Sequence, residues 1–311
     1  MRSYRRAGVV CGLGVAVLWA VAGGFPPARA QDATRQTPSS APERAAPIPF
    51  STLAARYDLR PLDDGPRWER LEVESLRWSN PVRNVDGGTV FLWCVRGRPQ
   101  ALVTLFTSAG GPPTIEHELS SLTDAPFAGT FDGKVVWKPK DAGVAWFPVP
   151  GAPPPAAGRP GRLAQMRQIS SEFVASHVKD ENDRPGALRR LTSPIHRYPE
   201  SADRDGALFA FAQTTDPELV LLLETEPPTE LPANGRASTE QTASGRKSGS
   251  SGYRFAIART SSYSMTVRHK DRVVWSAETW SWATRNPSEH YTMTFSKEPG
   301  LFGEETQHEA K

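Results

Sequence analysis

The sequence predicts an α+β protein of predominantly antiparallel β-sheet, arranged as two tandem helix-plus-meander repeats. Apolar runs recur in pairs around short turns, as in Val90–Val95 and Ala101–Phe106, which is typical of β-hairpins. The clearest helical periodicity covers residues 162–178, where apolar side chains recur every three or four positions. The hairpins also recur in the same order along the chain, which favours an internal repeat.

Residues 1–30 have the pattern of a secretory signal peptide. Three arginines lie within the first six residues, an apolar run covers residues 7–24, and Ala28-Arg29-Ala30 has the form of a cleavage site. The alternative is an uncleaved anchor, but the run is short for a membrane-spanning helix. We therefore expect an extracytoplasmic protein, periplasmic or secreted, with no transmembrane segment after cleavage.

Composition divides the rest of the chain into two ordered units and their connections. The connections are rich in Pro, Ser, Thr, Gly and charged residues, and such segments bury too little apolar surface to fold. The predicted order is a disordered linker 31–49, a first β-rich unit 50–150, a Pro-rich linker 151–161, a second β-rich unit 162–278 with a disordered insertion 226–252, and a poorly ordered tail 279–311.

Each unit is predicted to begin with a helix and to continue as hairpins. A short helix is expected from Ser51 to Tyr57, since serine is a good N-cap, and a longer one over 162–178. Asp132-Gly133 is a tight-turn signal before the strand Lys134–Trp137. The strand pairs expected in the second unit are 207–212 with 218–223, and 265–268 with 272–275.

The two units align at a nearly constant offset. The offset is 118 residues through the first hairpin and 138 afterwards, and the change falls at the polar stretch 226–252. Side chains alternate faces along a strand, so an even offset predicts matching core positions. The alternative is that two antiparallel meanders look alike by chance. The predicted equivalents include Phe91 with Phe209, Pro99 with Pro217, Trp137 with Trp275, and Pro81 with Pro199.

Charge and cysteine content narrow the function classes. The chain has 37 Lys+Arg and 34 Asp+Glu, but residues 1–30 hold four arginines and no acid. The mature chain would therefore be close to neutral, which gives no support to a nucleic-acid or membrane-surface partner. Cys94 would be the remaining cysteine after cleavage, and its apolar strand predicts a buried side chain.

Several motifs resemble an uncharacterised family of exported proteins from planctomycete-type bacteria. They are Leu76-Arg-Trp-Ser-Asn-Pro-Val-Arg83, the following Gly-Thr-Val-Phe-Leu-Trp, and later Val-Val-Trp-Lys-Pro and Pro-Val-Pro-Gly-Ala-Pro. The similarity covers most of residues 50–278. It implies an exported protein and supplies no activity and no site residues.

The strongest candidate for chemistry is Glu116-His117-Glu118. On a strand the two carboxylates project from one face and His117 from the other, so the three side chains cannot converge. A hydrolase using Glu116 and Glu118 with a histidine is one hypothesis. A solvated strand face is the alternative.

No other motif predicts a catalytic, cofactor or metal site. The histidines lack ligand spacing, and Asp180-Glu181-Asn182-Asp183 lacks the spaced ligands of a calcium loop. His177 is expected near the end of the 162–178 helix. Trp280 and Trp282 follow the last clear strand and are candidates for an exposed surface that grips a small molecule, sugar or lipid. The sequence therefore favours a non-enzymatic binding or structural protein.

Overall fold

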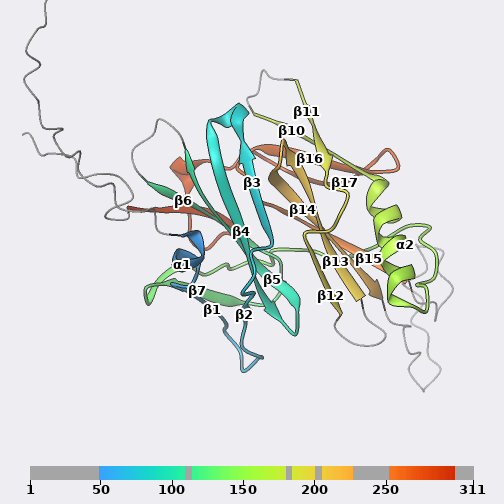
Figure 1. Ribbon diagram of the computed structural model, residues 1–311, viewed down its shortest axis with the longest axis horizontal. Helices are drawn as coiled ribbons and strands as arrows, with labels where there is room; N and C mark the ends of the chain where they lie inside the picture. The colour runs from blue at the N-terminus through green and yellow to red at the C-terminus, as the bar shows by residue number, and fades with distance from the viewer. Residues whose placement is uncertain (1–48, 109–113, 180–183, 200–204, 227–251, 298–311) are drawn as a thin grey trace, which may run out of the picture. The chain divides into compact units, whose positions relative to one another are not determined.

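The computed structural model describes residues 49–108, 114–179, 184–199, 205–226 and 252–297 (Figure 1). The predicted signal peptide, most of the linker 31–49 and nearly all of the insertion 226–252 lie outside these residues, as does Asp180–Asp183. The described chain is mainly antiparallel β-sheet with few helices, as the sequence predicted. Among the described residues, no helix has the length and apolar character needed to cross a membrane.

The first unit begins with a helix, continues as an antiparallel meander and ends in a short ninth strand. Its elements are α1 (Phe50–Ala54), β1 (Tyr57–Pro61), β2 (Glu69–Arg70), β3 (Leu76–Asn80), the 3-10 helix η1 (Pro81–Arg83), β4 (Val85–Val95), β5 (Arg98–Ser108), β6 (Ile115–Ser121), β7 (Phe127–Phe131), β8 (Lys134–Trp137) and β9 (Phe147–Pro148).

The second unit has the same order of α-helix and strands, but its 3-10 helix precedes the last strand instead of following the third. Its elements are α2 (Arg159–Ser171), β10 (Phe173–Val178), β11 (Gly186–Arg190), β12 (His196–Pro199), β13 (Asp205–Gln213), β14 (Asp216–Glu226), β15 (Gly252–Arg259), β16 (Ser264–His269), β17 (Arg272–Ala277), the 3-10 helix η3 (Trp282–Thr284) and β18 (Tyr291–Ser296).

The strand registers of the two units match residue by residue. Phe91 pairs with Val103 as Phe209 pairs with Leu221, at the predicted offset of 118. Trp137 pairs with Gly129 as Trp275 pairs with Val267, at the predicted offset of 138. The bulge between Trp93 and Cys94 recurs between Phe211 and Ala212. Because register, bulge and offset all agree, the internal repeat is a property of the fold.

Strands β3 and β12 give the repeat a second signature. In each unit a large aromatic ring, Trp78 or Tyr198, lies across a glycine of the neighbouring strand, Gly88 or Gly206. A Cβ on either glycine would lie 2.3 Å from ring atoms, so only glycine leaves room. These strands match at an offset of 120, and the predicted match of Pro81 with Pro199 is wrong. Pro81 begins η1, whereas Pro199 ends β12.

The two units exchange their last strands. β9, the last strand of the first unit, pairs with β15 of the second, while β18, the last strand of the second unit, pairs with β6 of the first. We call the two connecting segments, 138–146 and 278–290, the crossovers. Residues 279–311 were expected to form a poorly ordered tail, and β18 corrects this for residues 291–296. The error has a physical reason, because Tyr291–Ser296 pairs with a strand about 175 residues away and carries no local turn signal.

The buried apolar residues form three cores. One lies within the first unit around Phe91, Phe127 and Trp137, and one within the second around Phe209, Phe173 and Val267. The third contains side chains from both units, such as Val90, Leu92, Leu208 and Leu222, and it includes Cys94. Burial raises the pKa of the Cys94 thiol to about 12, in keeping with its predicted core position.

The helix expected over 162–178 is partly wrong. α2 runs from Arg159 to Ser171, and the chain then turns at Glu172 into strand β10, which pairs with β16. Phe173 therefore lies on a strand, with its ring in the second core. Apolar residues at 166, 169 and 173 fit a helix equally well, so periodicity alone could not locate the boundary. The short first helix likewise ends at Ala54, before the expected Tyr57.

Candidate binding cleft

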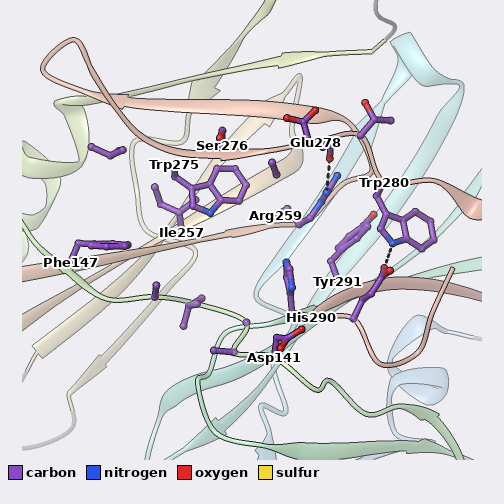
Figure 2. A pocket seen from close by; sticks show the side chains of 18 of the residues that line it. Asp141, Phe147, Ile257, Arg259, Trp275, Ser276, Glu278, Trp280, His290 and Tyr291 are labelled. Atoms are coloured by element: carbon purple, nitrogen blue, oxygen red, sulfur yellow. Dashed lines mark hydrogen bonds between the residues drawn. The ribbon is translucent and has the colours of Figure 1, made fainter. Parts of the chain in front are cut away.

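A cleft of about 710 Å³ lies where the first crossover passes beside β15 and β17 (Figure 2). Ile257 and Arg259 of β15 and Trp275 of β17 line it, and residues 141–145 with Phe147 form the facing side. Trp275 points from β17 toward Ile257, with Phe147 at one end of the cleft and Trp280 at the other. The described structure also has a smaller pocket, of about 160 Å³, beside β10 and β16.

The cleft exists because the exchanged strands differ in length. β18 pairs with six residues of β6, from Ile115 to Ser120, and the amide of Ser121 donates to the carbonyl of His290. β9 pairs with only Arg254 and Phe255 of β15. Within the described residues, the outer edge of β15 from Ala256 to Arg259 therefore has no partner strand.

The equivalent tryptophans show the same difference. Trp137 is fully buried, and its Nε1 donates to the carbonyl of Glu289 at 2.9 Å. The amides of Lys138 and Lys140 also donate to Pro287 and Ser288, so the second crossover covers this position. Trp275 occupies the same register position but is only partly buried. Its Nε1 makes no hydrogen bond to any described residue.

The charged side chains exposed in the cleft are acidic. Asp141 and Glu278 are exposed, and Glu289 accepts a hydrogen bond from Trp280 Nε1 at 2.6 Å. Arg259 is buried and donates to the carbonyls of Ser261, Glu278 and Tyr263. His290 is exposed at the cleft, and its partial desolvation, followed by the nearby Arg259 charge, lowers the pKa of the imidazole. The cleft therefore has net negative charge.

A buried acidic cluster lies behind the cleft floor. Tyr291 lines the cleft, lies under the Arg259 guanidinium at 4.8 Å from ring centroid, and donates from its hydroxyl to Glu118 at 3.0 Å. Glu118 in turn interacts electrostatically with Asp216 and Glu218 of β14. All three carboxyl groups are almost completely buried. The two units thus place three acids in the interface between them.

Arg83 is the cation of this cluster. Its Nη1 donates to Asp216 at 3.0 Å and lies 3.4 Å from Glu218 Oε1, while its guanidinium stacks on Tyr263 at 4.4 Å. Asn80 Nδ2 also donates to Asp216, at 2.9 Å. Arg83 is thus the cation in direct contact with the cluster, and the Arg259 and Lys179 charges act on Glu118 and Glu218 from further away.

Burial is the main cause of the altered acidities. It raises the pKa of Glu118 well above its usual value, and the negative charge of Asp216 adds to the effect. It also raises the pKa of Glu218 to about 7, against the opposing attraction of Arg83. The pKa of Asp216 is raised for the same reason, although Arg83 and Asn80 favour its ionised form.

These shifts predict that stability falls as the pH rises toward neutrality. Glu218 has a folded-state pKa of about 7 against a reference value of 4.5, so between these values the folded state holds more protons. The contribution is fully present below pH 4.5 and is lost as the pH passes 7, a change on the order of 3 kcal/mol. Urea unfolding from pH 4.5 to 8 measures it. Glu218→Gln should flatten this fall, while Glu69→Gln, at an exposed carboxylate, should leave it unchanged.

The structure separates the residues of the predicted catalytic motif. Glu116-His117-Glu118 lies on β6, with Glu118 in the buried cluster. His117 is buried on the other face, where Nδ1 lies 2.7 Å from Tyr57 Oη and Nε2 lies 3.0 Å from Ser296 Oγ. Burial, assisted by the Arg56 charge, lowers the pKa of His117 to about 4. The geometry agrees with the expected opposite faces.

The other histidines lie apart from one another. His177 belongs to strand β10, which corrects its expected place on a helix, and it packs against Gly186 and Tyr263. His196 contacts the carbonyl of Gly97, and His269 contacts Glu172. Among the described residues, no group of three His, Cys, Asp or Glu side chains has a metal-binding arrangement. Trp282 is exposed, as expected, whereas Trp280 is half-buried at the cleft.

The residues that form the cleft were not identified from the sequence as one site. Trp275 was expected in the core, and Arg83, Asp216 and Glu218 showed no local motif. No family model, curated protein or solved structure matches this chain.

Proposed function

We propose that this chain is an exported, non-enzymatic binding protein that takes its ligand in the cleft between β15, β17 and the first crossover. One observation carries the proposal. The cleft is the open counterpart of a position that the second crossover and β18 fill in the first unit. A cavity with aromatic side chains and a few polar groups is typical of a ligand site.

The hydrolase alternative has less support in the geometry. Glu118 is bound to Tyr291 in the interface and lies on the face of β6 opposite to His117. The signal-peptide pattern of residues 1–30 supports the proposal of export.

The test compares two tryptophans. We expect the chain purified from its source organism to carry a bound species, seen by native mass spectrometry, which Trp275→Ala removes. Trp282→Ala should retain it, because Trp282 does not line the cleft. A bound species unaffected by Trp275→Ala, or the absence of any bound species, would contradict the proposal. Glu118→Gln should bind as the wild type does if no catalytic carboxylate is involved.

A further inference from the structure

The open edge of β15 indicates the chemistry of the ligand. The amide of Val149 donates to the carbonyl of Tyr253, at the start of the pairing between β9 and β15. Hydrogen-bonded positions alternate along an antiparallel strand, so the outward backbone groups beyond this point belong to Phe255, Ile257 and Arg259. Phe255 pairs with Phe147, whereas Ile257 and Arg259 line the cleft.

The equivalent strand edge in the first unit, on β6, shows what can pair with the open edge of β15. The residues equivalent to Ile257 and Arg259 are Leu119 and Ser121 of β6, at the offset of 138. There Leu119 pairs with Thr292 of β18, and Ser121 donates to His290. The same position is filled by an extended polypeptide in one unit and lies open in the other.

Resting on the proposed function, we infer that the cleft binds an extended, basic peptide segment of a partner protein, added as a strand to β15 beside β9. Strand addition supplies main-chain hydrogen bonds to the peptide, and the neighbouring side chains select among sequences. Trp275 and Trp280 provide apolar contacts, and the exposed acids Asp141 and Glu278 select for lysine or arginine.

The negative charge of the cleft favours a basic partner peptide over this chain's own C-terminal segment as its occupant. Residues 298–311 contain four glutamates and one lysine, which an acidic cleft would repel. The segment 31–48 has equal numbers of acidic and basic residues and offers no electrostatic attraction. A basic partner peptide therefore complements the cleft charge better than either of these two segments.

The first measurement is amide hydrogen exchange of the full chain by NMR. We expect Ile257 and Arg259 to exchange much faster than their equivalents Leu119 and Ser121, which β18 protects. Protection of Ile257 and Arg259 in the full chain that is lost on truncation after Lys297 would show that the C-terminus occupies the edge. Protection that grows with protein concentration, together with a dimer in sedimentation, would identify a second copy. Either result would overturn the inference.

The second measurement adds a probe peptide, Lys-His-Tyr-Thr-Met-Thr-Lys, which carries residues 290–294, His290 and the first four residues of β18, between lysines. It should slow exchange at Ile257 and Arg259 and leave Leu119 and Ser121 unchanged. Two versions with N-methyl groups on alternate residues should differ, since only one removes donors that face β15. That version should bind about tenfold more weakly or worse.

Charge reversal provides the matched control. The double variant Asp141→Lys, Glu278→Lys should bind the lysine peptide more weakly. It should bind a version with glutamate at both ends more tightly. If millimolar peptide protects neither amide, or if both N-methylated versions bind equally, strand addition is wrong. A native ligand that needs Trp275 but leaves both amides exchanging would overturn strand addition while the proposed cleft function stands.

Discussion

Replacing Arg83 with methionine is expected to lower the free energy of unfolding by about 3–5 kcal/mol at neutral pH. Arg83 is the cation bound to Asp216 and lies beside Glu218, and both carboxyl groups are almost completely buried. Methionine keeps much of the side-chain volume but removes the cation that contacts these acids directly. Removing one partner of a buried ion pair costs more than the pair itself contributes. Urea unfolding monitored by tryptophan fluorescence measures the loss.

Two controls separate this effect from a general loss of an arginine. Arg77→Met removes an exposed arginine that contacts Glu74, and the expected loss is below about 1 kcal/mol. Adding Glu218→Gln to Arg83→Met should restore part of the lost stability, because it removes one uncompensated acid. The loss should also shrink at acidic pH, where the carboxyl groups are protonated. Equal losses for Arg83→Met and Arg77→Met would show that the buried cluster has no special role.

The repeat could be predicted because its signals are local. Phe91 and Phe209 lie in hairpins whose turns fix the register, and an even offset keeps both side chains in the core. Residues 132–133 and 270–271 form equivalent tight turns with positive φ angles, although only the first has the Asp-Gly signal. Local patterns of this kind can be recognised in a single sequence.

The exchange of strands and the cleft could not be predicted, because they depend on contacts between residues far apart in the sequence. Phe147–Pro148 is too short to show alternation, and the partner of β18 lies far away in sequence. The buried cluster joins Arg83 to two residues more than 130 positions later. Such contacts depend on how the two units pack, and the spacing of residues within either unit does not predict them.

The same packing predicts unequal effects for the two equivalent tryptophans. Trp137→Ala is expected to lower the free energy of unfolding by about 3–5 kcal/mol, as for a large aromatic removed from a core. Trp137 is fully buried among Phe127, Leu59 and the second crossover, so its loss leaves a cavity and an unpaired carbonyl on Glu289. Trp275→Ala should cost only about 1–2 kcal/mol, because its ring is partly open to the cleft.

For peptide binding, we expect Trp275 to matter more than Trp137, the opposite of their order for stability. Trp275→Ala should abolish protection of Ile257 and Arg259 by the lysine peptide, since Trp275 lines the cleft beside them. Trp137→Phe, which keeps most of the buried apolar surface, should bind the peptide as the wild type does. Urea unfolding and peptide titration of the same variants test both halves. Equal losses of stability for Trp137→Ala and Trp275→Ala would show that the second crossover adds little stability at Trp137. The comparison of the two positions would then no longer support a binding site over Trp275.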